Sequence, residues 1–177
     1  RRHAEHAATL VDLEFDHAGK HFCLLEDTRL RSQFGRLIGL VAESHWYEVD
    51  ELPSRLGRRM GATGSLPNDW TVDPVKVAAL LRLADASHLD SRRAPLFLHT
   101  YRKPSGKSEE HWLFQERMAK PILAVDRLEY TSTSPFAVAE SAAWWVAYDS
   151  LRMVDGELRR VDALCADLQL PRMRVRS

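Results

Sequence analysis

The stretch of sequence that decides the fold is LLRLADASHLDSRRAP, residues 80–95. It begins as an apolar helix, because hydrophobic residues recur at spacings of three and four. These spacings predict one buried stripe, made of Val77, Leu80, Leu81 and Ala84. Asp85 and His88 follow at a spacing of three, which places them about one turn apart on one helix face. Pro95 limits how far the helix can continue.

Asp85 is an acidic residue in an otherwise apolar helix, where a charge is costly to bury unless it is paired or bound to a metal. The residues alone leave two explanations open. In the first, Asp85 forms a salt bridge with Arg82 or Arg92, and His88 caps the end of the helix. In the second, Asp85 is a metal ligand.

The composition predicts one domain of ordinary size with a hydrophobic core. The chain has 177 residues, 45% of them hydrophobic, and its 25 Lys and Arg balance its 25 Asp and Glu. The balance gives no signal for nucleic acid or for a membrane surface as partner, and no long apolar run or signal peptide is present. Cys23 and Cys165 are single cysteines in apolar surroundings, which predicts reduced, buried thiols in a cytoplasmic protein.

Before the deciding stretch, the pattern predicts two helices separated by a loop. Residues 1–15 are predicted to form the first helix. His3 and His6 lie on the same side of it, where they either bind a metal or are exposed to solvent. Residues 16–28 are predicted to be a loop with a short helical turn. The second helix, residues 29–46, has an apolar stripe that we expect to be buried: Leu30, Phe34, Leu37, Ile38, Val41 and Ala42.

After the deciding stretch, the sequence predicts further helices and a short β-prone segment. Residues 121–134 alternate and favour one or two short strands. Residues 136–169 keep a helical period and predict one long helix or two. The chain begins without methionine and ends in a basic segment, so we interpret it as a fragment of a longer protein.

These patterns resemble the HD superfamily of all-helical, metal-dependent phosphohydrolases, and especially its HD-CE type. That type occurs in large bacterial proteins that often also carry an Hsp90-like ATPase domain. LLRLADA, followed by Asp90 and RRAP, resembles the family's last metal-ligand helix, which implies that Asp85 binds metal. HAEHAA at residues 3–8 resembles a His-Gly-x-x-Ser-Ala pattern, with alanine at two positions, and implies a metal role for His3. Ser44-His45 resembles a pair that ends such a helix, and implies that His45 binds metal or phosphate.

The resemblance also implies a reaction and a substrate class. Asp85 and His45 would be catalytic, with Mn, Fe or Mg as the divalent metal. Arg92, Arg93 and His88 would bind the phosphate of a nucleotide or phosphate ester. A His-Trp pair resembles one found in the family, so His111 and Trp112 would line a nucleotide pocket, where the indole stacks on a base. A buried, packing Trp112 is an equal alternative.

The sequence departs from the family pattern at one point, and this departure leaves three hypotheses open. No histidine in the sequence is directly followed by aspartate, whereas the family is defined by an adjacent His-Asp dyad. The chain is therefore either a phosphohydrolase whose dyad lies upstream, or a degenerate sensor or scaffold module joined to other domains of a larger ATPase-linked protein. A third hypothesis is a helical interaction domain with incidental histidines. We expect residues 1–118 to form the HD-like helical domain, and residues 119–177 an accessory segment of strands and a long helix.

Overall fold

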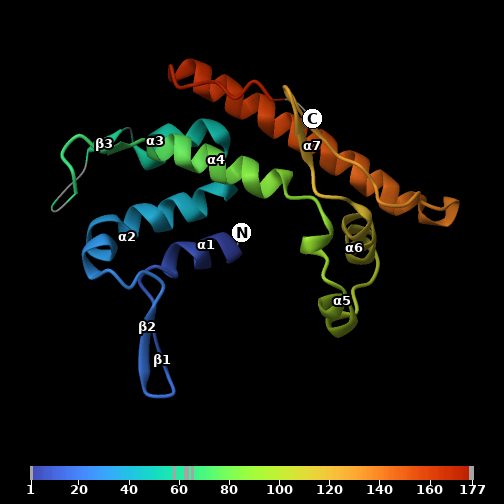
Figure 1. Ribbon diagram of the computed structural model, residues 1–177, viewed down its shortest axis with the longest axis horizontal. Helices are drawn as coiled ribbons and strands as arrows, with labels where there is room; N and C mark the ends of the chain where they lie inside the picture. The colour runs from blue at the N-terminus through green and yellow to red at the C-terminus, as the bar shows by residue number, and fades with distance from the viewer. Residues whose placement is uncertain (1, 58, 62–63, 65, 176–177) are drawn as a thin grey trace. The chain divides into compact units, whose positions relative to one another are not determined.

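The computed structural model describes residues 2–57, 59–61, 64 and 66–175, and the protein is mainly α-helical (Figure 1). The predicted fold class, helical with a short β-prone segment and a long C-terminal helix, is confirmed. The chain divides into two compact units, residues 1–82 and 83–177. Helix α4 (Pro74–Ser87) contributes to both of them.

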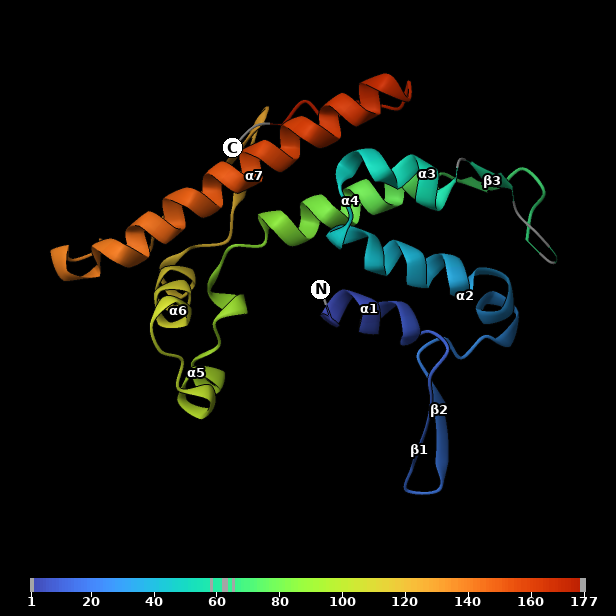
Figure 2. The ribbon, with the colours of Figure 1, turned by 180° about the vertical axis from the view of Figure 1, so that it is seen from behind.

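The first unit combines helices with two small antiparallel hairpins. Figures 1 and 2 both show the β1–β2 hairpin projecting away from α1 and α2. The elements before α4 are α1 (Arg2–Thr9), β1 (Glu14–His17), β2 (Lys20–Cys23), α2 (Thr28–Glu43), the 3-10 turns η1 (Ser44–Trp46) and η2 (Val49–Glu51), α3 (Leu52–Leu56), β3 (Met60–Gly61) and β4 (Thr71–Val72).

Helices α1 and α2 pack antiparallel through a glycine face. Gly35 and Gly39 lie one turn apart on α2 and are both buried. A Cβ at position 39 would come closer than van der Waals contact to the carbonyl oxygen of Ala8, and a Cβ at position 35 would lie 3.2 Å from Cγ1 of Val11. The two glycines therefore allow the backbones to approach closely, and this approach places the start of α1 beside the end of α2.

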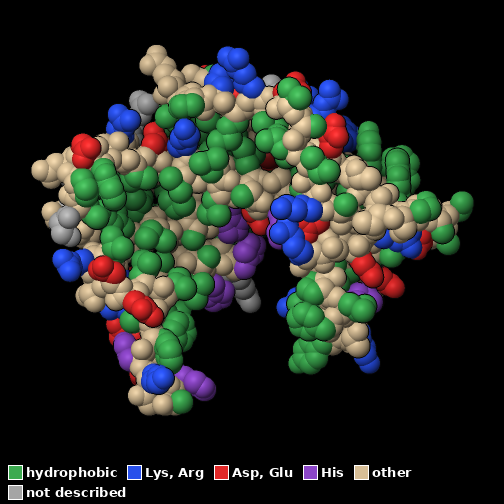
Figure 3. Space-filling model, in the orientation of Figure 1, with side chains coloured by type: hydrophobic (Ala, Val, Ile, Leu, Met, Phe, Trp, Pro, Cys, Tyr) green, Lys and Arg blue, Asp and Glu red, His purple; other side chains and the backbone are tan. Residues whose placement is uncertain are grey.

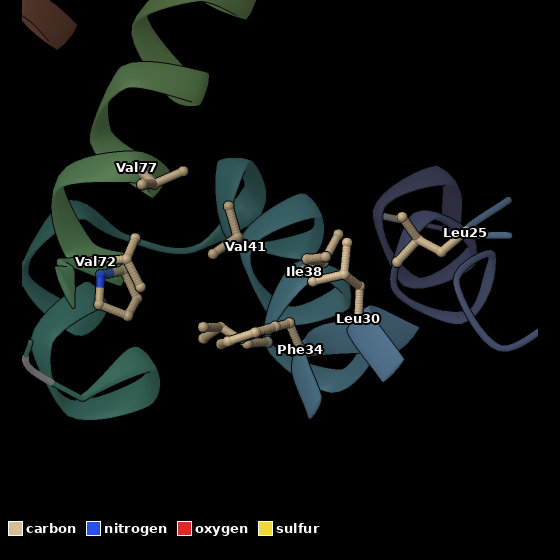
Figure 4. Close-up of a pocket in the computed structure, with 9 residues that line it drawn as sticks. Leu25, Leu30, Phe34, Ile38, Val41, Val72 and Val77 are labelled. Carbon is tan, nitrogen blue, oxygen red and sulfur yellow. The ribbon is translucent and has the colours of Figure 1, made fainter. Parts of the chain in front are cut away.

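The large apolar side chains of α2 do not form the predicted buried stripe. Leu30 and Ile38 are 38% and 39% exposed, and Figure 3 shows hydrophobic side chains gathered over α2. They line an apolar pocket of about 320 Å³, together with Val72 and Val77 (Figure 4). The prediction was wrong because the glycine face, and not the face with the largest side chains, makes the contact with α1.

Helix α4 also buries a different face from the one predicted. Leu80, Leu81 and Val77 were expected to be buried but are 48%, 39% and 41% exposed. The buried face of the helix is made of residues that are mostly smaller: Val75, Ala78, Ala79 and Leu83. The helix begins as predicted, since Asp73 Oδ1 accepts a hydrogen bond from the backbone N–H of Lys76 at 3.1 Å.

Residues 16–28 are not the predicted loop, because β1 and β2 form a hairpin there. Ala18 and Gly19 connect the strands with positive φ angles of 50° and 72°. Two consecutive positive φ angles are typical of a type I′ turn, whose twist matches that of the flanking strands. The helix predicted for residues 1–15 accordingly ends at Thr9.

The second unit contains the end of α4 and the helices that follow it. Its elements after α4 are η3 (Ser91–Arg93), α5 (Leu96–Arg102), α6 (Lys107–Arg117), β5 (Ile122–Ala124), β6 (Arg127–Glu129), η4 (Val138–Glu140) and α7 (Ser141–Asp167). One or two short strands were predicted within residues 121–134, where β5 and β6 form a short hairpin, and α7 is one continuous helix of 27 residues. Among the described residues, no helix has both the length and the hydropathy needed to cross a bilayer.

The C-terminal end of α4 is anchored by two side chains from later in the chain. Arg93 Nη1 donates to the carbonyl oxygens of Asp85 and His88 at 3.1 and 3.2 Å. Tyr130 donates its hydroxyl to the carbonyl oxygen of Ser87 at 3.0 Å, and burial raises the pKa of Tyr130 to about 12. Both contacts satisfy carbonyl groups that a helix end leaves without an intrahelical partner.

Replacing Tyr130 with phenylalanine is expected to destabilise the protein by about 1 kcal/mol. The change removes the hydroxyl and its hydrogen bond to the carbonyl of Ser87, while the ring stays in place and the backbone N–H of Leu89 still donates to that carbonyl at 2.9 Å. Tyr101→Phe is the control, because Tyr101 is 86% exposed, and it should leave the free energy of unfolding unchanged. Urea unfolding measures both, and equal values for the two variants would contradict the anchoring role of Tyr130.

Candidate functional site

Two histidines from opposite ends of the first 45 residues meet in the first unit. His3 of α1 and His45 of η1 lie with their Nε2 atoms 3.0 Å apart, and their ring centroids are 5.1 Å apart. Figure 3 shows histidine side chains at the start of α1. The antiparallel packing of α1 on α2 produces this meeting, because His45 directly follows the last turn of α2.

The tautomer of His45 is fixed by its surroundings. Its Nδ1 lies 2.6 Å from the carbonyl oxygen of Ala42 and must donate to it. In this tautomer the Nε2 atom of His45 accepts the hydrogen bond from Nε2–H of His3. This contact also ties the ring of His45 to the last turn of α2.

The two Nε2 atoms of the histidine pair are joined by a hydrogen bond of 3.0 Å. The separation is close to that of two nitrogen ligands on one metal ion, which is about 3.0 Å at a right angle and about 3.4 Å in a tetrahedron for bonds of about 2.1 Å. A backbone carbonyl on the second ring nitrogen is the usual partner of a metal-bound histidine. Trp46 packs edge-on against His3, with centroids 5.9 Å apart, and holds that ring in place.

Arg82, in the middle of the LLRLADA stretch, positions His45 through hydrogen bonds to the backbone. Its Nη1 donates to the carbonyl oxygen of His45 at 3.2 Å and to that of Tyr47. The guanidinium thereby holds the backbone on both sides of Trp46. The sequence offered Arg82 only as a partner for Asp85, although a single cation among Leu80, Leu81, Leu83 and Ala84 was a signal for a role inside the unit.

An acidic pocket of about 260 Å³ adjoins the histidine pair, since Ala4 and Trp46 line it. Its charged lining is Glu5, Glu43, Glu48, Glu51 and Arg55. Arg55 forms an ion pair with Glu51 at 3.1 Å and lies 4.3 Å from the ring centroid of Tyr47. Burial and a hydrogen bond with Glu43 raise the pKa of Tyr47. With four carboxylates and one guanidinium, this pocket attracts cations more strongly than phosphates.

Asp85 lies in the second unit and forms an ion pair. Its Oδ1 is 3.4 Å from Nη2 of Arg93, and its side chain is 55% exposed. The first explanation of Asp85 named Arg82 or Arg92 as the partner, whereas the structure shows Arg93. That explanation also gave the helix cap to His88, but Arg93 makes the capping contacts.

The predicted phosphate ligands Arg92 and His88 both contact Asp90, a residue with 2% exposure. Arg92 donates from its backbone N–H, from Nε and from Nη2 to the Asp90 carboxylate, at 2.6–3.2 Å. These bonds lower the pKa of Asp90 to about 2. The Nε2 atom of His88 lies 3.5 Å from Asp90 Oδ1. Asp90 thus organises the turn that follows α4, and it engages two of the three predicted phosphate ligands.

His111 and Trp112 lie side by side on α6 but face different surroundings. The ring of Trp112 lies 5.4 Å from that of His99 on α5. His111 contacts the buried Phe114 at 5.7 Å and lines a pocket of about 320 Å³ between α6 and α7. Consecutive helical residues point about 100° apart, so the two rings belong to different contacts.

Most of the chain matches one known protein family. The model of the HD-CE family matches residues 1–160, which include His3, His45 and the LLRLADA stretch. No curated protein and no solved structure matches the chain.

Proposed function

Because the chain belongs to the HD-CE family, we propose that it is a metal-dependent phosphohydrolase that acts on a nucleotide or another phosphate ester. The observation that carries this proposal is the convergence of the His3 and His45 Nε2 atoms at 3.0 Å. Imidazole nitrogens are common ligands of transition metals, and a metal would replace the proton that the two Nε2 atoms share in their hydrogen bond. They favour Mn or Fe over Mg, which prefers oxygen ligands.

His3 and His45 of the first unit supply nitrogen ligands to this metal. The family resemblance implies a metal role for Asp85 as well, and this role rests on the resemblance alone. A divalent metal, when bound, lowers the pKa of a coordinated water and neutralises phosphate charge. Arg82 acts through the backbone of His45 and is a positioning residue.

Arg92 and Arg93 of the second unit have different partners and different proposed roles. Arg92 is tied to Asp90, so Arg93 is the better candidate for a phosphate contact, with Asp85 as its partner in the free protein. A metal on Asp85 would compete with Arg93 for the carboxylate and release the guanidinium toward an anion. The fork of an arginine matches the geometry of phosphate oxygens.

A screen of nucleotides and phosphate esters with Mn²⁺ tests the proposal. The expected result is metal-dependent release of phosphate by the protein, reduced by at least about 100-fold in Asp85→Asn and in His45→Ala. Asp126→Asn is the control, since Asp126 is 70% exposed in the turn between β5 and β6, and it should keep full activity. Hydrolysis that is equal in all four proteins would contradict the assignment.

A second candidate is a non-catalytic module that binds a nucleotide without hydrolysing it, within a larger ATPase-linked protein. The sequence favours it in one respect, because no histidine precedes an aspartate directly. The same screen separates the two candidates. Nucleotide binding that depends on His45, without release of phosphate at any metal concentration, would support the module and contradict the enzyme.

A further inference from the structure

The β1–β2 hairpin presents four potential metal ligands on one face. Glu14 pairs across the strands with Cys23, and Asp16 pairs with His21. Side chains alternate along a strand, so residues two apart and directly opposite each other share a face. Two cross-strand pairs of the same face therefore bring a thiol, an imidazole and two carboxylates together.

Three of these side chains converge on one point. His21 Nε2 lies 3.6 Å from Glu14 Oε2 and 3.8 Å from Cys23 Sγ, and the three ligand atoms all lie within 4.8 Å of one another. Around a tetrahedral zinc ion, with bonds of about 2.1 Å to nitrogen or oxygen and about 2.3 Å to sulfur, the same separations are about 3.4 and 3.6 Å. Small side-chain shifts suffice to close the site.

The outer contacts already orient two of the three ligands, His21 and Glu14. Asp16 Oδ1 lies 3.0 Å from His21 Nδ1, which directs the other ring nitrogen toward Glu14 and Cys23. A carboxylate on the far nitrogen is a frequent partner of zinc-bound histidine. Arg31 Nη2 lies 3.3 Å from Glu14 Oε1 and leaves Oε2 turned toward His21.

We propose that Glu14, His21 and Cys23 bind a zinc ion, with Asp16 as the carboxylate that orients His21. One thiolate, one imidazole and one carboxylate form a donor set typical of zinc, and the thiolate disfavours Mg or Mn. Cys23 gives up its proton to solvent when the metal binds. The fourth position is open to water. Cys23 is thus half-buried beside polar ligands, whereas the sequence predicted a buried thiol in apolar surroundings.

A metal cross-link between the strands would also stabilise the hairpin. It is a two-stranded sheet in which seven of the eight strand residues are exposed. Two-stranded hairpins are marginally stable in water unless they are packed or stapled. A metal held by β1 through Glu14 and by β2 through His21 and Cys23 joins the two strands, so binding energy becomes folding energy of the hairpin.

Titration with Co²⁺, a spectroscopic substitute for zinc, tests this site. The expected result is a thiolate-to-cobalt charge-transfer band in the near ultraviolet that saturates at one ion per chain and is removed by added Zn²⁺. Cys23→Ser should abolish the band, and Asp16→Asn should weaken Co²⁺ binding by about 10-fold. No charge-transfer band with the unaltered protein, or a band that persists in Cys23→Ser, would overturn the proposal.

Two matched variants separate this site from the other features of the chain. Cys165→Ala removes the second thiol, which is buried in α7, and it should retain the band. His45→Ala should also retain it, because the histidine pair contains no sulfur. A band that is lost in Cys165→Ala and kept in Cys23→Ser would overturn the hairpin site, and it would leave the proposed phosphohydrolase untouched because that proposal uses no thiolate.

Discussion

Gly39→Ala is expected to destabilise the protein by about 2 kcal/mol and to separate His3 from His45. The added methyl would overlap the carbonyl oxygen of Ala8, which belongs to the backbone and cannot rotate away. Overpacking of this kind costs about 1–3 kcal/mol and is relieved by moving the helices apart. Since α1 carries His3, this movement would also weaken metal binding by the histidine pair. Urea unfolding and Mn²⁺ titration measure the two effects.

Gly156→Ala is the matched control for this prediction. Gly156 lies inside α7, and a Cβ there would meet nothing within 4 Å. Alanine is the better helix former, so this variant should be more stable by roughly 0.5–1 kcal/mol. If Gly39→Ala were as stable as Gly156→Ala, then α1 and α2 would not be in the close contact that places His3.

Asp90→Asn is expected to destabilise the protein by about 2 kcal/mol at neutral pH. The carboxylate is almost fully buried and accepts charge-assisted hydrogen bonds from Arg92. Asparagine keeps one oxygen but loses the charge, so the turn that carries Arg93 loosens, and the contacts of Arg93 with the end of α4 weaken with it. Asp126→Asn makes the same substitution at an exposed ion pair of 3.9 Å. It should have no measurable effect.

The same carboxylate makes stability depend on pH in the acid range. The pKa of Asp90 is lowered from 3.8 to about 2 in the folded protein, so the folded state favours the ionised form. Its contribution is fully present above pH 3.8 and is lost as the pH falls toward 2. Because Arg92 is 61% exposed and partly screened by solvent, the loss amounts to about 1–2 kcal/mol. The acid dependence should be smaller by this amount in Asp90→Asn, and an unchanged acid dependence would contradict the pairing.

Much of the secondary structure could be predicted from the sequence, because it depends on local signals. Asp73 and Pro74 begin α4, the alternating segment 121–134 contains the β5–β6 hairpin, and the helical period of residues 136–169 yields α7. Burial could not be predicted in the same way. The period of large side chains locates a helix, but the small residues on its other face decide which side makes the closest contact, as Gly35 and Gly39 do.

Residues of the candidate site could be predicted from the sequence only where they belong to a motif that resembles a known family. His3 and His45 were selected by resemblance, and their meeting depends on the glycine contact between α1 and α2, which no motif describes. The ligand cluster of the hairpin was missed because residues 16–28 were expected to be a loop. The sequence did contain a signal for this cluster. Glu14 and Asp16 precede Gly19, His21 and Cys23 follow it, and the two members of each pair are two residues apart. Once a turn is placed at Gly19, these positions share one face of two strands.

The measurement that tests the account most directly is the affinity for Mn²⁺ of the chain with and without His45. It is best made in Cys23→Ser, so that the hairpin site does not contribute, with His6→Ala as control because His6 is an exposed histidine of α1. We predict binding of one ion that His45→Ala weakens by at least about 100-fold and that His6→Ala leaves unchanged. Equal affinities in all three proteins would contradict a metal centre built on His3 and His45.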